Sequence, residues 1–223
     1  LSDRPIGSGS VQFNSNYGIF QDPNNRGAFQ NVWAAQTAES SSPYVGDSVF
    51  EYTYNATPTP SNNNWEFTGN SWNFSSVMNT AFTGRCTHDG TNIVVGQASN
   101  TPAAGQSHLY LYTLAGAYTN TTTNMYSDLA ALTNTHTIEG ITSDGTNIYA
   151  MMAAGGVDSY LLTYDKSLNF VSSINLTTVG GMPQGASIGM ISVDQSGSIY
   201  IVKASTIYKF NLSTGASESL PNN

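Results

Sequence analysis

The sequence contains very little charge. Only 9% of its 223 residues are Asp, Glu, Lys or Arg, whereas about a quarter is usual for a soluble globular domain. Small polar residues take their place, with 28 Ser, 25 Thr and 23 Asn. A surface of this kind is solvated by hydroxyls and amides rather than by ions, which is more common in secreted and cell-surface proteins than in cytosolic enzymes. We therefore predict an extracellular or cell-surface location.

Basic residues are the scarcest charged type. The chain has six, against 14 acidic residues, and its net charge is −8. They are scattered, at Arg4, Arg26, Arg85, Lys166, Lys203 and Lys209. Because a protein that binds phosphates needs clustered Lys and Arg, neither nucleic acid nor an anionic membrane surface is an expected partner.

Cysteine and long apolar runs are also missing. Cys86 is the single cysteine, so an intrachain disulfide and a cysteine-rich metal site are both excluded. No apolar run approaches the ~20 residues that a membrane-spanning helix needs. With 39% hydrophobic residues, a chain of this length can still bury a sizeable core and fold on burial alone.

One pattern occurs four times along the chain. Each copy has a glycine, a short run, an aspartate, turn residues and then an apolar or aromatic run. The copies are "GIFQDPNNRGAFQNVWAAQ" from Gly18, "GRCTHDGTNIVVGQAS" from Gly84, "GITSDGTNIYAMMAA" from Gly140 and "GMISVDQSGSIYIVKAS" from Gly189. Their turn aspartates are Asp22, Asp89, Asp144 and Asp194. Asp-Gly favours a hairpin, because Gly adopts positive φ at no steric cost and Asp bonds to the backbone two residues on.

A second strand-like stretch follows each copy, and a shorter run follows that stretch. The second stretches are "SVFEYTYN", "HLYLYTL", "SYLLTYD" and "TIYKFNL", and the shorter runs are "WEF", "YTNTTT", "FVSSINL" and "SESL". Their aromatic and β-branched residues favour strands. Each unit therefore predicts four antiparallel strands joined by hairpins. Helical periodicity is nearly absent, and "MYSDLAALTN" from Met125 is the one candidate for two or three helical turns.

Four-stranded units repeated every 50 to 67 residues resemble the blades of a β-propeller. The resemblance covers about residues 11–220 and is to the architecture, because no Trp-Asp signature, kelch glycine pair or hemopexin-like pattern is present. It implies an all-β fold, a four-bladed propeller with blades at about 11–75, 76–124, 125–178 and 179–223, after an N-terminal extension of residues 1–10. The alternatives are a β-sandwich or other stacked β architecture, and a half-ring completed by a second chain.

Residues with catalytic or metal-binding potential do not combine into a motif. Gly185–Gly189 fits G-x-S-x-G around Ser187, but it leads into a strand rather than a helix. His88 adjoins a turn aspartate, and His136 lies in a polar connection. Sequence places no two acids together for glycoside hydrolysis; those considered are Glu51, Glu66, Asp128, Glu139 and Asp158. We predict no catalytic residue, no cofactor and no metal ligand, although Asp and Asn oxygens leave calcium open.

Five N-x-[ST] sequons mark candidate N-glycosylation sites. They begin at Asn55, Asn73, Asn120, Asn175 and Asn211. This number is what chance gives for 23 Asn among 53 Ser and Thr in 223 residues, so the sequons alone are weak evidence for a glycoprotein.

These observations support three hypotheses about function. The first is a non-enzymatic extracellular structural protein, a subunit that assembles with copies of itself into a filament, sheath or surface layer. The second is a carbohydrate-binding, lectin-like propeller, because 13 Tyr can stack on sugar rings. The third is a glycan-active enzyme. For the first hypothesis we also predict that residues 1–10 contact protein rather than solvent.

Overall fold

The structure is a computed structural model of the chain, and part of the sequence is described in it. The described residues are 19–21, 23, 32–36, 48–54, 65–74, 85–97, 107–133, 136–185, 188–194, 196–203 and 206–220. The expectations for residues 1–10, Asp22, Asn55 and Ser187 therefore lie outside the described residues.

The strands form four sheets of four, and every pairing is antiparallel between strands that follow one another in the chain. The first sheet has β1 (Ile19–Gln21), β2 (Val32–Gln36), β3 (Ser48–Tyr54) and β4 (Trp65–Asn73); the second has β5 (Arg85–His88), β6 (Asn92–Gln97), β7 (His108–Thr113) and β8 (Tyr118–Asn124); the third has β9 (Thr137–Ser143), β10 (Asn147–Ala153), β11 (Tyr160–Asp165) and β12 (Phe170–Asn175); the fourth has β13 (Ile188–Val193), β14 (Ser198–Lys203), β15 (Thr206–Asn211) and β16 (Ser217–Leu220). The prediction of an all-β chain with four antiparallel units is confirmed.

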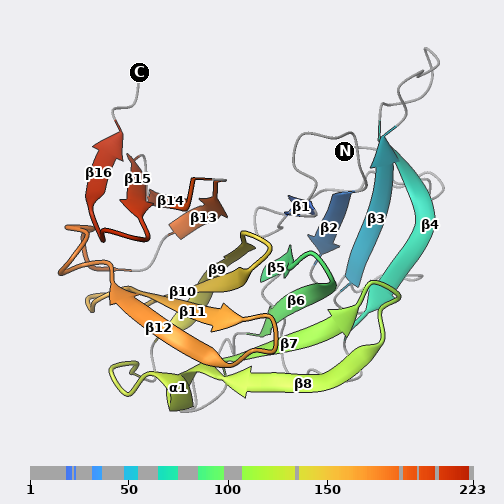
Figure 1. Cartoon of the computed structure of the whole chain (residues 1–223), viewed down its shortest axis with the longest axis horizontal. Coiled ribbons are helices and arrows are strands. Elements are labelled where there is room, and N and C mark those ends of the chain that lie inside the picture. Colours follow the sequence, from blue (N-terminus) through green and yellow to red (C-terminus); the bar gives the residue numbers. More distant parts are fainter. Residues whose placement is uncertain are drawn as a thin grey trace.

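The four sheets are arranged around a common centre (Figure 1). The first strand of each sheet is the innermost, so that β1 lies beside β5, β5 beside β9, and β9 beside β13. The last strands, β4, β8, β12 and β16, form the outside. This is the predicted four-bladed propeller rather than a β-sandwich.

Hydrophobic clusters fill the spaces between successive sheets. One cluster, around Tyr112, joins the first and second sheets. A second, around Leu162, joins the second and third, and a third, around Phe210, joins the third and fourth. Within the described part of the chain, no such cluster joins the fourth sheet to the first.

Three of the repeat aspartates, Asp89, Asp144 and Asp194, lie between the first two strands of their sheets. Asp89 Oδ1 accepts the backbone N–H of Thr91 and of Asn92, at 2.7 and 2.6 Å. Asp144 Oδ1 accepts the equivalent pair, from Thr146 and Asn147, at 2.8 and 2.7 Å. The glycine that follows each aspartate has positive φ, 92° at Gly90 and 89° at Gly145. The Asp-Gly sequence therefore sets these turns through both of its residues.

The innermost strands approach one another closely. A Cβ atom added to Gly140 in β9 would lie 2.1 Å from Cγ2 of Ile191 in β13. A Cβ added to Gly96 in β6 would lie 2.5 Å from Cδ1 of Ile141. Small residues at these positions let the third sheet pack against its neighbours on both sides.

Two local predictions were wrong. The candidate helix is a single turn, α1 (Met125–Asp128), because Leu129 is extended with φ −134°. Leu129 and Leu132 pack against the same core cluster as Met125, but they do so outside the helix. The last strand of the first sheet is nine residues long rather than the three of "WEF". A register shift between Phe50 and Tyr52 lets β4 bend and keep pairing with β3.

Candidate interaction surface

The second and third sheets each present one face to the preceding sheet and the other to the following sheet. In three sheets an isoleucine paired with an aromatic residue marks the face toward the preceding sheet. These pairs are Ile93 with Tyr112, Ile148 with Tyr164, and Ile199 with Phe210. All six side chains are buried in the clusters between sheets. Since side chains alternate along a strand, the residues one position away face the following sheet.

The face toward the following sheet is covered in the second and third sheets. There the cross-strand pairs are Val94 with Leu111, Gly96 with Leu109, Tyr149 with Thr163 and Met151 with Leu161, and all are buried. The fourth sheet has Tyr200 paired with Lys209 and Val202 paired with Ile207 at these positions. Ile207 is 37% exposed, and the other three are half-buried. We call Tyr200, Val202, Ile207 and Lys209 the fourth-sheet face.

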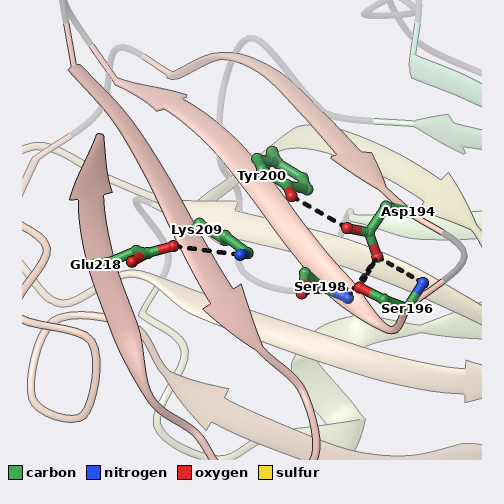
Figure 2. Close-up of polar contacts among 6 residues, drawn as sticks. All are labelled: Asp194, Ser196, Ser198, Tyr200, Lys209 and Glu218. Atoms are coloured by element: carbon green, nitrogen blue, oxygen red, sulfur yellow. Dashed lines mark hydrogen bonds and ion pairs between the residues drawn. The ribbon is translucent and has the colours of Figure 1, made fainter. Parts of the chain in front are cut away.

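Polar groups surround Tyr200 and Lys209 on this face (Figure 2). The Tyr200 hydroxyl donates to Asp194 Oδ2 at 3.0 Å. Asp194 Oδ1 accepts the backbone N–H of Ser196 and of Ser198, at 2.8 and 2.9 Å. Lys209 Nζ lies 3.2 Å from Glu218 Oε1 on β16. A row of polar side chains therefore crosses three strands, from Tyr200 through Lys209 to Glu218.

These contacts fix the charges of the row. The Ser196 hydroxyl contributes most to lowering the pKa of Asp194 to about 2, and the Ser198 backbone N–H, the Tyr200 hydroxyl and the Ser196 backbone N–H add to it. The hydrogen bond to Asp194 raises the pKa of Tyr200, and the Glu218 carboxylate raises the pKa of Lys209. At neutral pH Asp194 is therefore ionised, Tyr200 keeps its proton and Lys209 is a cation.

The third sheet contains the same aspartate–tyrosine pair in a covered form. The Tyr149 hydroxyl donates to Asp144 Oδ2 at 2.7 Å, and Tyr149 is buried against the fourth sheet. Burial, followed by the hydrogen bond to Asp144, raises the pKa of Tyr149 to about 12. Tyr149 thus shows how this position looks once another sheet packs on it.

Both candidate histidines support connections. His88 Nδ1 accepts the backbone N–H of Gly90 at 2.8 Å, within the turn of its own sheet. His136 Nδ1 accepts the N–H of Thr133 at 2.9 Å, so its Nε2 carries the proton and donates to the Asp158 carbonyl at 2.8 Å. His136 therefore ties the connection before β9 to the loop between β10 and β11.

The acidic residues considered as catalytic candidates each contact a different set of neighbours. Their hydrogen-bonding or ionic partners are Thr68 and Asn70 for Glu51, Thr123 and Tyr164 for Asp128, Arg85 and Thr137 for Glu139, and Asn175 and Gln184 for Asp158. The side chain of Glu66 lies outside the described part. Among the described residues, no three His, Cys, Asp or Glu side chains are placed to hold a metal ion, and no helix is long and apolar enough to cross a membrane.

The sequence reasoning did not identify the fourth-sheet face. The sequence does contain a signal for this face. Aligning "NIYAMMAA" with "SIYIVKAS" places Tyr200 at the position of Tyr149 and Val202 at the position of Met151. The alignment alone cannot reveal which of these positions another sheet covers.

Comparisons with known proteins complete the description of the chain. The sequence matches no protein-family model and no curated protein. Among solved structures, the hemopexin fold protein CP4 from cow pea is similar at 14% sequence identity and a TM-score of 0.43. The similarity covers 92% of this chain and 90% of that one.

Proposed function

We propose that this protein is a non-enzymatic extracellular structural subunit that assembles with copies of itself through the fourth-sheet face. One observation carries the proposal. Tyr200, Val202 and Ile207 occupy positions that the next sheet buries elsewhere, yet Ile207 is 37% exposed. Apolar residues in register on a sheet face that is only half-buried within the described part of the chain are typical of a surface that another protein covers.

The outer strands are less suited to assembly than this face. Register shifts interrupt the pairing of β4, β8 and β12 with their neighbours, and such bulges protect sheet edges against the addition of another strand. The remaining outer strand, β16, has four residues and contains Glu218. Contact through a face rather than an edge is therefore favoured.

Charge favours a second copy as the occupant. Two chains with a net charge of −8 repel each other, and a cation on the shared surface reduces that repulsion. Lys209 of the fourth-sheet face pairs with the Glu218 carboxylate, and Tyr200 of the same face bonds to the Asp194 carboxylate (Figure 2). A patch with both signs of charge is self-complementary, as a contact between identical surfaces requires.

The proposed extracellular location is supported by two of the four outer strands. The outer strands β8, "YTNTTTN", and β12, "FVSSIN", contain no charged residue. Water solvates their Thr, Ser and Asn side chains through neutral groups. The solubility of such a surface therefore depends little on the surrounding ionic strength, because salt screens charges.

The test compares two substitutions of exposed apolar residues. Ile207→Asp places a charge on the fourth-sheet face, whereas Val171→Asp places one on β12, where Val171 is 57% exposed. Because burying an isoleucine side chain contributes about 1.5–3 kcal/mol, we expect Ile207→Asp to weaken self-association at least about tenfold. Val171→Asp is expected to associate like the wild type in sedimentation velocity over a concentration series. A wild type that stays monomeric at every concentration, or equal effects of both variants, would contradict the proposal.

Carbohydrate binding is the second candidate, and a specific observation favours it. The half-buried Tyr200 pairs across the strands with Lys209, and its hydroxyl bonds to Asp194. An aromatic ring beside polar groups offers a sugar both an apolar face and hydrogen-bonding partners. Glycan-array binding that Tyr200→Phe keeps and Tyr200→Ala loses would favour this function over self-assembly.

A further inference from the structure

We infer that Asn120 is the sequon asparagine at which the folded chain carries an N-linked glycan, in preference to Asn175 and Asn211. The inference rests on the proposed extracellular location and does not depend on self-assembly. Three of the five sequons can be compared, since Asn55 and the side chain of Asn73 lie outside the described residues.

Asn120 lies at the crest of a bulge in β8. Tyr112 pairs with Tyr118, and Tyr110 pairs with Thr122, so three residues of β8 lie opposite one residue of β7. Asn120 is the middle one of the three and has φ 61°, a conformation that asparagine tolerates better than most residues. Its side chain is exposed, and it points to no partner among the described residues.

The flanking threonines hold the bulge in place without using the amide. The Thr119 hydroxyl donates to the Leu111 carbonyl at 3.0 Å, and the Thr122 hydroxyl donates to the Leu109 carbonyl at 2.8 Å. No contact among the described residues uses the Asn120 side chain, so Nδ2 can accept a substituent on the outside of the second sheet.

The other two asparagines use their side chains to build turns. Asn175 Nδ2 donates to Asp158 Oδ2 at 2.8 Å, and its Oδ1 accepts the N–H of Thr177 and of Thr178, both at 3.0 Å. A glycan on this nitrogen would meet the Asp158 carboxylate. Asn211 Oδ1 accepts the Ser213 hydroxyl at 2.6 Å and the Ser213 N–H at 3.0 Å, which holds the sequon in a tight turn after β15.

The chemistry of the modification is a group transfer from a polyprenyl-diphosphate-linked oligosaccharide by an oligosaccharyltransferase. A bond forms between Asn120 Nδ2 and C1 of the first sugar, and the bond between C1 and the diphosphate oxygen breaks. The amide loses one proton, and the polyprenyl diphosphate leaves. Transfer accompanies chain synthesis, so the fold determines which modified chains reach the native state.

The test is secretion of the whole chain from a eukaryotic host, followed by tryptic glycopeptide analysis of the folded fraction. The scarce basic residues separate the sequons, because residues 86–166 contain only Asn120, residues 167–203 contain only Asn175 and residues 210–223 contain only Asn211. We expect the 86–166 peptide to carry the glycan and the 167–203 and 210–223 peptides to be unmodified. Absence of a glycan from 86–166, or a native fraction with a glycan at Asn175 or Asn211, would overturn the inference.

Two variants separate loss of the site from loss of the fold. Asn120→Asp removes the sequon and keeps a side chain that tolerates positive φ, so we expect secretion at the wild-type level with one glycan fewer. Thr122→Ser keeps both the sequon and a hydroxyl for the Leu109 carbonyl, so the glycan should remain. Loss of the glycan from Thr122→Ser, or its persistence on the 86–166 peptide of Asn120→Asp, would contradict the assignment.

Discussion

Two tyrosines at equivalent positions make the same hydrogen bond in different surroundings. Tyr149 donates to Asp144 at 2.7 Å and is buried, whereas Tyr200 donates to Asp194 at 3.0 Å and is half-buried. The cost of removing a hydroxyl depends on whether water can replace it as a partner. Removing the hydroxyl from each tyrosine in turn therefore shows which of the two positions another sheet covers.

Removal of these hydroxyls is expected to have unequal effects. Tyr149→Phe leaves a carboxylate oxygen of Asp144 without its buried donor, so we expect a loss of about 1–2 kcal/mol in the free energy of unfolding. Tyr200→Phe exposes Asp194 to water and should cost less. Urea denaturation of the monomer under identical conditions provides the comparison. Equal losses would mean that the two positions are equally covered.

At the scale of the element, the innermost strands depend on a missing side chain. Gly140 lies within β9, and any Cβ there would meet Ile191 in β13 at 2.1 Å. Backbone and side chains of two sheets would have to separate to admit a methyl group. The glycine is thus required by the junction between the third and fourth sheets rather than by a turn.

Gly140→Ala is expected to lower the free energy of unfolding by about 1–3 kcal/mol, as overpacking of a core does. Gly155→Ala is the control, because a Cβ at Gly155 meets nothing within 4 Å. The double variant Gly140→Ala/Ile191→Ala should cost less than the sum of its single changes, since alanine at position 191 removes the clashing Cγ2. Additive costs in thermal or urea unfolding would show that the clash is relieved in another way.

Local signals predicted the elements well where one residue type determines the backbone. The Asp-Gly pairs at Asp89 and Asp144 indicated hairpins, and the structure contains those turns. The short candidate helix and the end of β4 were not predictable in this way. α1 ends after Asp128 because the chain turns extended toward the core, and β4 continues because β3 supplies hydrogen-bonding partners. Both element ends are determined by contacts with residues that are distant in the sequence, so a short stretch of sequence does not reveal them.

At the scale of the whole molecule, the repeat predicted the number and order of the sheets, but not that the fourth-sheet face is only half-buried within the described part of the chain. Tyr200, Val202 and Ile207 resemble core residues in sequence, and their exposure depends on where the first sheet lies relative to the fourth. Likewise, the sequons at Asn120 and Asn175 have the same sequence pattern. They differ in structure, because the Asn175 side chain bonds to Asp158. The candidate site is therefore determined by contacts between residues that lie far apart in the sequence.

Acid is expected to destabilise the whole propeller. Hydrogen bonds lower the pKa of Asp158, chiefly from the Asn175 amide, and of Asp165, chiefly from the Asn169 amide. The pKa of Asp194 is about 2 in the folded chain, against an ordinary value of 3.8. These depressed values stabilise the fold above about pH 4, and that stability disappears as the pH falls through about 2.

Urea unfolding between pH 7 and pH 2 measures this effect. We expect the wild-type free energy of unfolding to fall below about pH 4. Asp194→Asn cannot be protonated in this range, so its stability should fall less over the same interval. A wild-type profile that stays flat down to pH 2 would contradict the prediction.

The confinement of each cluster to two successive sheets has an evolutionary consequence. The second and third sheets meet their neighbours through equivalent pairs of faces, with an isoleucine–aromatic pair on one side and apolar cross-strand pairs on the other. A duplicated copy of one sheet, inserted between them by recombination, would find a matching surface on either side. In this architecture the number of sheets can therefore change by duplication of a whole sheet, while the existing sheets keep their sequences.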